Sequence, residues 1–253
     1  MAATGYRRRL EQSASLLALL AVWLFATTVV AVVPSLPSPV EVLVALANTV
    51  TGPYYWEEVL RSTFRVYLSF VLAAVIGVPL GIAIGRSQVF ADLTFPALEV
   101  LRPIPPIAWF PALTIILLSA ENIVRFIIFL AAFFPILLNT IEGVRGIETE
   151  YAQAASSLGA SSWQRLRHIV LPGALPSIYT GLVNAMGLAW VSLVAAELLS
   201  SSGIGYFIWN AFTAGAYPNI VVGMITVGAL GYASSTLVRW LGARQLPWMQ
   251  TGE

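Results

Sequence analysis

Apolar stretches alternate with short polar segments along this 253-residue chain. Six long apolar stretches occur, at 16–33, 66–84, 104–118, 123–141, 178–199 and 220–241. Most approach the roughly 17–25 residues that cross a ~30 Å hydrocarbon layer as a helix, and the third does so once 95–103 is included. Helix is required because lipid cannot satisfy backbone N–H and C=O groups. The pattern therefore predicts an all-α membrane protein with six transmembrane helices.

The segments that follow the first and fifth apolar stretches are predicted to lie on the outer side. Val40, Leu43, Val44 and Ala47 recur at helical spacing after a proline-rich break, which favours a short amphipathic helix on the outer surface. The aromatic residues at 54–56 suit the interfacial belt of a membrane protein. Residues 203–218 are predicted as an outer loop.

Glycine and proline mark two of the predicted crossings. Gly77, Gly81 and Gly85 are spaced four residues apart, which places them on one helix face and favours close packing against another helix. Five prolines lie between Pro96 and Pro111, so the third crossing is predicted to be irregular. Irregular backbone at membrane depth is tolerated only against protein or a water-filled cavity. The third crossing is therefore the first candidate for the wall of a pathway.

Charge predicts the orientation and excludes one class of partner. The chain contains no lysine, and with the amino terminus inside, nine arginines face the cytoplasm and three face outward, as the positive-inside rule expects. Both termini are therefore predicted to be cytoplasmic. A signal peptide is disfavoured because the first apolar stretch is long and lacks a small-x-small cleavage site. The net charge of +1, without a basic patch carrying interleaved aromatics, argues against nucleic acid.

Composition also argues against enzymatic activity. The absence of cysteine excludes disulfides, thiolate metal sites and cysteine nucleophiles. A P-loop needs a lysine, so the chain is predicted to have no such nucleotide site. His168 is the single histidine and Asp92 the single aspartate, which leaves neither a serine-protease base in the membrane nor a pair of aspartates.

The polar segment after the fourth crossing is predicted to be helix, sharp turn and helix. Acidic residues at 148 and 150 favour a helix start, and Gly159 supplies the positive φ that ends that helix. Ser161 and Gln164 have the spacing of a capping box for a second helix. Pro172 and Pro176 then lead into the fifth crossing.

The same segment carries a motif. Gln153-Ala-Ala, three residues, Gly159, nine residues, Ile169, one residue and Leu171-Pro172 resemble the signature of binding-protein-dependent ABC permeases. That signature begins with Glu, where this chain has Gln153. Further segments resemble the nitrate, sulfonate, taurine and bicarbonate branch of the family, at 36–39, 77–85, 101–111, 195–198 and 203–205.

The resemblance implies a type I ABC importer permease with a MetI-like fold. Residues 1–253 would form one transmembrane domain, with a short cytoplasmic amino terminus at about 1–12 and a cytoplasmic coupling loop at about 145–172. The implied partners are two ABC ATPase subunits, a second permease copy forming a homodimer, an extracytoplasmic substrate-binding protein and the lipid of a prokaryotic cell membrane. ATP and Mg would be bound by the partner ATPase, and no cofactor by this chain.

In that family the coupling loop docks on the ATPase. The residues that the resemblance assigns to ATPase coupling here are Gln153, Ala154, Ala155, Gly159, Ala160, Trp163, Arg165, Ile169, Leu171 and Pro172. Replacement of Glu by Gln153 removes a charge but keeps length and hydrogen bonding. Glu150 is an alternative source of that charge, beside its role at the helix start.

Candidate pathway residues are Arg102, Pro105, Pro106 and Glu197. Ionisable groups in a membrane are costly and mark function by default, so Arg102 is a candidate to guide an anion, and Glu197 to shape an outer gate. The alternatives for Arg102 are an ion pair with Glu99 or snorkelling, and for Glu197 an interhelical hydrogen bond. Arg65 is expected at the outer headgroups.

The resemblance implies import of a small anionic solute resembling sulfonate, nitrate or taurine. Import of a vitamin precursor or an aromatic compound on the same scaffold is the alternative. An ATPase-independent carrier or channel is the rival from another class.

Overall fold

The computed structural model describes residues 14, 17–18, 20–27 and 35–245, and within these ranges every regular element is a helix. The predicted amino-terminal segment 1–12 lies outside the described residues, and the predicted first crossing at 16–33 is described only in part. Four of the described helices are long and apolar enough to cross a membrane. The all-α membrane class is therefore confirmed for the described part of the chain.

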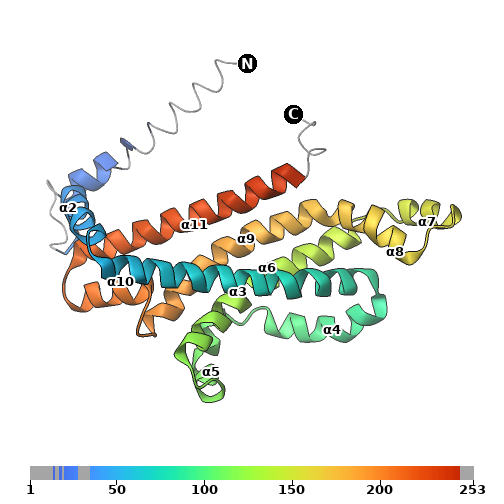
Figure 1. The fold of residues 1–253 in the computed structure, drawn as a ribbon, viewed down its shortest axis with the longest axis horizontal. Helices are drawn as coiled ribbons and strands as arrows, with labels where there is room; N and C mark the ends of the chain where they lie inside the picture. Colours follow the sequence, from blue (N-terminus) through green and yellow to red (C-terminus); the bar gives the residue numbers. More distant parts are fainter. Residues whose placement is uncertain (1–13, 15–16, 19, 28–34, 246–253) are drawn as a thin grey trace.

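These long helices form the body of the molecule (Figure 1). They are α3 (Pro53–Arg86), α6 (Ala120–Arg145), a continuous helix (Ser162–Leu198) that ends as α9 (Leu171–Leu198), and α11 (Tyr217–Gln245). They coincide with the second, fourth, fifth and sixth predicted apolar stretches. Each helix is also longer than its apolar stretch, because it continues into the residues that flank the stretch.

The third predicted crossing is broken into short pieces. α4 (Gln88–Leu101) is followed by a turn through Pro103 and Pro105, a 3-10 turn (Pro106–Trp109) and the short α5 (Phe110–Ile116). Proline removes a backbone donor and disfavours helical conformation in the residue before it, so closely spaced prolines interrupt the helix. The irregular backbone that the sequence predicts is confirmed, and no continuous helix spans this segment.

Short helices occupy the two ends of the bundle (Figure 1). At one end lie α2 (Pro39–Val50) and α10 (Ile204–Thr213), and at the other end project α7 (Thr149–Ser157) and α8 (Ser162–Arg165). The prediction of an outer loop over 203–218 is wrong, because most of that segment is α10. Ile204 and Ala211, seven residues apart and so on one face of α10, are both buried, and this packing explains why the segment is helical.

The predicted amphipathic helix is α2, which begins with a capping box. The Ser38 hydroxyl accepts the Glu41 N–H at 3.3 Å, and the Ser38 N–H donates to the Glu41 carboxylate at 2.7 Å. The backbone bond from Ser38, followed by the bond from its hydroxyl, holds the pKa of Glu41 below its ordinary value. Val42 packs inward, whereas Val40 and Leu43 of the predicted apolar face are exposed.

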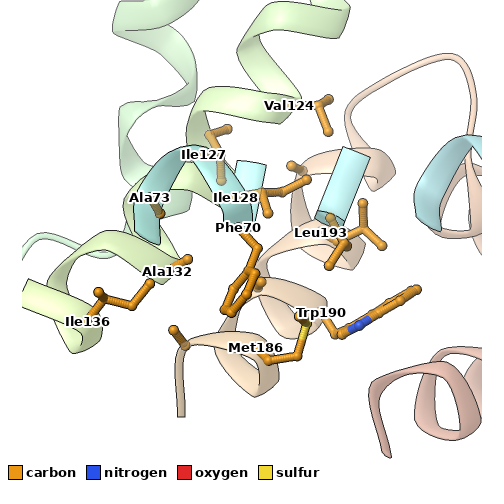
Figure 2. Close-up of a cluster of buried hydrophobic side chains, with 14 of the residues drawn as sticks. Phe70, Ala73, Val124, Ile127, Ile128, Ala132, Ile136, Met186, Trp190 and Leu193 are labelled. Atoms are coloured by element: carbon orange, nitrogen blue, oxygen red, sulfur yellow. The ribbon is translucent and has the colours of Figure 1, made fainter. Parts of the chain in front are cut away.

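The core lies between α3, α6 and α9. Figure 2 shows Phe70 of α3 beside Met186 and Trp190 of α9, with Ile127 and Ile128 of α6 in the same buried cluster. All five side chains are at most 8% exposed. Burial of one such side chain contributes about 1.5–3 kcal/mol relative to exposure in water, although within lipid the gain comes from packing rather than from leaving water.

The predicted glycine stripe forms the contact between α3 and α6. A Cβ at Gly77 would lie 3.2 Å from Ile136, and a Cβ at Gly81 would lie 2.7 Å from the Cβ of Thr140. At Gly85 the same atom would lie 2.7 Å from Val144. At Gly81 and Gly85 contacts this short leave no room for a side chain, whereas at Gly77 the Ile136 side chain would have to shift by a few tenths of an ångström. The glycines therefore allow the two helices to approach closely, as the sequence predicts.

Candidate functional site

The projection between α6 and α9 is a capped helix followed by a sharp turn. Gly159 has φ +82°, and its N–H donates to the Ser156 carbonyl at 2.9 Å. The Ala160 N–H donates to the Ala155 carbonyl at 2.9 Å, which completes a Schellman cap on α7. Apart from its chain neighbours, no atom of the described residues lies within 4 Å of the place that a Cβ of Gly159 would occupy, so backbone conformation favours glycine here.

The second arm of the projection is continuous with a long apolar helix. The Ser161 hydroxyl accepts the Gln164 N–H at 3.3 Å, and the Gln164 side chain accepts the Ser161 N–H at 2.7 Å, which forms the predicted capping box. A π-helical turn (Leu166–Val170) joins α8 to α9. The helix thus runs without a break from Ser162 to Leu198, and Pro172 lies near the start of α9.

The surface of the projection mixes apolar and polar side chains. Tyr151, Leu158 and Trp163 are 61%, 89% and 67% exposed. Arg165 ties the two arms together, because its guanidinium donates to the hydroxyl groups of Ser156 and Ser162.

The predicted coupling residues divide into two sets in the structure. Gln153, Ala154, Gly159 and Trp163 are exposed, and Ala155, Ala160 and Arg165 are half-buried. Ala154, Ile169 and Pro172 line one open groove of about 670 Å³ between α7 and the start of α9. Leu171 lies beside that groove at the first position of α9 and is 37% exposed. The motif residues therefore belong to one continuous helix–turn–helix unit.

A second feature is a cavity of about 600 Å³ between α6, α9 and the proline-rich turn. Arg102 and Pro106 line it, so the structure brings together two of the candidate pathway residues, while Pro105 lies between them in the chain. Its polar lining also includes Asn139, Glu142, Asn184 and Ser192. The rest of the lining is mainly apolar, from Ile104, Leu130, Ala131, Phe134, Pro135, Leu138 and Leu188.

Arg102 is exposed at the carboxyl end of α4. Within the described residues no ion pair joins it to Glu99 or to any other carboxylate. Glu142 lines the same cavity and is the acidic group there. The alternative of a Glu99 pair is thus absent from the described part of the structure, and Arg102 lines an open, mostly apolar cavity.

A buried ion network lies at the opposite end of the bundle from the projection. Arg65 of α3 is only 1% exposed, so the expectation that it sits at the outer headgroups is wrong. Its Nη1 donates to Glu197 at 2.7 Å and to the Ser202 carbonyl at 2.9 Å, and its Nε donates to Glu121 at 3.1 Å. Nη2 donates to Glu121 and, at 2.8 Å, to the Ser202 hydroxyl. All five guanidinium donors are therefore used.

Glu197 is at the centre of this network. Its carboxylate is fully buried and accepts bonds from the Ser62 hydroxyl at 2.8 and 2.9 Å and from the Gly205 N–H at 2.9 Å, in addition to the bond from Arg65. An interhelical hydrogen bond, the alternative that the sequence left open for Glu197, is thus present. The carboxylate connects α9 to α3 and to the start of α10.

The turn between α9 and α10 is built around Glu197. Gly203 has φ +104°, and a Cβ there would lie 2.1 Å from the Glu197 carboxyl carbon. The Gly203 N–H donates to the carboxylate of Glu58, and the Ile204 N–H donates to Ser62 at 2.8 Å. The first backbone donors of α10 are therefore satisfied by side chains of α3 and α9, as a buried helix start requires.

Sequence reasoning missed this network, although a signal was present. Glu58, Ser62, Arg65 and Ser69 recur every three or four residues, which is a polar stripe along one face of α3, and all four are buried. The predicted second crossing began at residue 66 and separated most of this stripe from the membrane segment. Among the described residues no group of three or more metal-ligating side chains occurs.

The long apolar helices, the open cavity between them and the projection define a multi-pass α-helical membrane protein. Comparison with known proteins specifies this class further. The chain belongs to the family of binding-protein-dependent transport system inner membrane components, whose model matches residues 75–251. The family predicted from the motif at 153–172 is thereby confirmed.

Curated relatives place the chain in one branch of that family. It is 35% identical to the nitrate import permease protein NrtB of Synechocystis sp., over 84% of this chain and 81% of that protein. It is 38% identical to the bicarbonate transport system permease protein CmpB of Synechococcus elongatus, over 74% and 68%. It is 34% identical to the taurine transport system permease protein TauC of Escherichia coli, over 92% and 88%.

The fold has a counterpart among solved structures. A chain of the MetNI methionine ABC transporter, in an inward-facing conformation, matches with a TM-score of 0.58 at 20% identity and covers 74% of this chain and 95% of that one. This likeness supports the predicted MetI-like fold for the matched part of the chain.

Proposed function

We propose that this chain is the pathway-forming subunit of an ATP-driven importer of a small anionic solute. The relatives named for nitrate, bicarbonate and taurine transport support this substrate class, because all three solutes carry an anionic group. The described helices would supply the second to sixth crossings, and residues 16–33 the first. Both termini and the projection would then face the cytoplasm, as the distribution of arginines favours.

The projection is the proposed contact with a partner ATPase. The observation that carries this proposal is the unbroken helix over Ser162–Leu198, because it joins the projection directly to a membrane-crossing segment. A displacement of α8 would therefore reach α9 without an intervening loop, and Arg165 bonds α8 to Ser156 of α7. The exposed Tyr151, Leu158 and Trp163 provide apolar area for the contact. Two ATPase copies and two permease copies would form the complex, with ATP and Mg held by the ATPases.

Gln153 is proposed to take part in this contact by hydrogen bonding. It lies on the exposed side of α7, and its backbone carbonyl accepts the Ser157 hydroxyl at 3.1 Å. A neutral amide forms no ion pair, so the charge that the family motif has at this position would be absent from the docking surface. Glu150, in the first turn of the same helix, is the nearby acidic residue that would supply it.

The cavity beside Arg102 is the proposed transit site for the solute. The Arg102 guanidinium would attract an anion and the Glu142 carboxylate of the same mainly apolar wall would oppose it, while Asn139, Asn184 and Ser192 provide uncharged hydrogen-bonding groups. Pro105 and Pro106 would hold the irregular wall of this site. Glu197 would shape the outer end of the pathway through its contacts with α3 and α10. An extracytoplasmic binding protein would deliver the solute at that end.

The proposal is tested by purification of the tagged chain in mild detergent, with mass spectrometry of the proteins and small molecules that accompany it. Recovery of a Walker-type ATPase and a loaded binding protein supports the importer and identifies its solute. A bound vitamin precursor or aromatic compound would replace the small anion as cargo. Recovery of this chain alone, from a preparation active in uptake without ATP, would instead show an ATPase-independent carrier.

A further inference from the structure

The end of α9 at residue 198 is connected to α10 by the short turn and also by a hydrogen bond to the Glu197 carboxylate. Glu197 lies in the last turn of the helix that begins in the projection, and the connection to α10 spans only residues 199–203. The Glu197 carboxylate accepts the Gly205 N–H at 2.9 Å, so a side chain of α9 holds the first turn of α10 directly. α10 in turn presents Trp209 and Phe212, which are 45% and 55% exposed.

Arg65 secures this junction from the side of α3. It bonds Glu197 on one flank and Ser202 of the connecting turn on the other, at distances of 2.7 to 2.9 Å. Glu58 and Ser62, from the preceding turns of α3, accept the N–H groups of Gly203 and Ile204. Side chains of α3 therefore bond three consecutive residues of the turn and the helix start, 202–204.

Stability alone is a weak explanation for this arrangement. Removing two charges from solvent costs several kcal/mol per ion, and apolar residues of similar volume often serve stability as well or better. What the ions add is directional bonding, because all five guanidinium donors of Arg65 have acceptors in this arrangement of the helices. The close approach of this turn to Glu197 also depends on glycine, because a Cβ at Gly203 or at Gly205 would overlap the Glu197 side chain.

We propose that Glu197 and Arg65 are positioning residues that make α10 move together with α9, so that displacement of the cytoplasmic projection reaches the outer surface at α10. This inference rests on the proposed ATP-coupled function. For binding free energies, coupling between two sites is reciprocal. A binding protein that docks at the outer end is therefore expected to act on the ATPase through the same junction, and a variant of the junction loses this effect.

The test uses the complete transporter in liposomes, with its binding protein. The Glu197→Gln side chain keeps the shape of the carboxylate but loses one acceptor oxygen and the charge opposite Arg65. The ratio of ATPase activity with loaded binding protein to activity without it is expected to fall about tenfold, which corresponds to about 1.4 kcal/mol in the activation free energy. Uptake falls with it, while the concentration of binding protein at half-maximal stimulation changes little.

The matched control is Ser234→Ala in α11. Ser234 is 3% exposed and receives bonds from Tyr67 of α3 at 2.9 Å and from Trp190 of α9 at 3.3 Å. This variant also breaks buried interhelical bonds, but at no contact with α10. It is expected to lower the unfolding midpoint and to keep the stimulation ratio. An equal loss of the ratio in both variants would show that the junction is merely structural and would overturn the inference.

A second variant tests the positioning role of the junction if the Glu197→Gln protein does not assemble into the transporter. Arg65→Lys keeps the charge but has three donors in place of five, so it cannot hold Glu197, Glu121 and Ser202 together. An assembled Arg65→Lys complex with a reduced ratio supports the inference, and one with the wild-type ratio overturns it. Absence of ATP-driven uptake in the wild-type complex would be a failure of the proposed function instead, so the two failures are distinguishable.

Discussion

The packing of α3 against α6 makes a quantitative prediction for Gly81→Ala. The added Cβ would lie 2.7 Å from the Cβ of Thr140, 2.8 Å from its Cγ2 and 2.9 Å from the Leu137 carbonyl oxygen. Thr140 is fully buried, and its hydroxyl donates to the Ile136 carbonyl at 2.7 Å. Neither the backbone oxygen nor the bonded threonine yields easily, so the helices must separate.

The expected sign of the change in unfolding free energy follows from two opposing energies. Overpacking of a close-packed contact costs roughly 1–3 kcal/mol, whereas replacement of glycine by alanine within a helix gains about 0.5–1 kcal/mol. The net effect of Gly81→Ala is therefore a loss of roughly 0–2.5 kcal/mol of unfolding free energy, with a midpoint of about 1 kcal/mol. Gly228→Ala in α11 is the matched control, because no atom lies within 4 Å of its Cβ position and only the helix gain applies.

The measurement is a denaturant titration of both purified variants in detergent, followed by tryptophan fluorescence. Gly81→Ala is expected to unfold at a lower denaturant concentration than the wild type, and Gly228→Ala at an equal or higher one. The reasoning is refuted if Gly81→Ala is as stable as Gly228→Ala, because the close approach of α3 and α6 would then be absent in the membrane protein.

Three further predictions address the projection, the cavity and the outer turn. Gly159→Val should abolish co-purification of the ATPase or ATP-driven uptake without preventing membrane insertion, since a left-handed conformation costs an L-residue about 1–2 kcal/mol; Gly159→Asn should be tolerated, and normal uptake by the valine variant would contradict the docking role. Arg102→Ala should lower uptake roughly tenfold, or about 1.4 kcal/mol, with less effect on ATPase co-purification; unchanged uptake would leave Arg102 a structural residue. Gly203→Ala should cost more than about 3 kcal/mol of unfolding free energy, since its Cβ would overlap Glu197; an unfolding curve like that of the wild type would refute the geometry of the turn.

Elements with strong local signals were predictable from the sequence. The Ser161 and Gln164 capping box, the glycine turn at Gly159 and the stripe ending at Gly85 depend on spacing within a few residues. The long helices follow from apolar length, because lipid leaves the backbone no other way to satisfy its polar groups.

Features that depend on several helices meeting were not predictable. α10 is short, and its helical state is fixed by burial of Ile204 and Ala211 against distant elements. The expected place of Arg65 at the headgroups followed from its sequence position near the end of an apolar stretch. The partners that bury it, Glu121 and Glu197, are 56 and 132 residues away in the chain. The cavity beside Arg102 likewise depends on where α6 and α9 place Asn139 and Asn184.

The π-helical turn at Leu166–Val170 changes the angular position of the side chains of α8 relative to those of α9, although the two form one continuous helix. One residue advances an α-helix by about 100°, and a π turn accommodates one extra residue without breaking the helix. Insertion or deletion of a residue at 166–170 would therefore rotate the exposed face of α8 about the helix axis. The face that α9 buries in the bundle would keep its contacts. Adaptation to a different ATPase partner would then require a change in the number of residues in the π-helical turn and no change in the packing of the transmembrane helices.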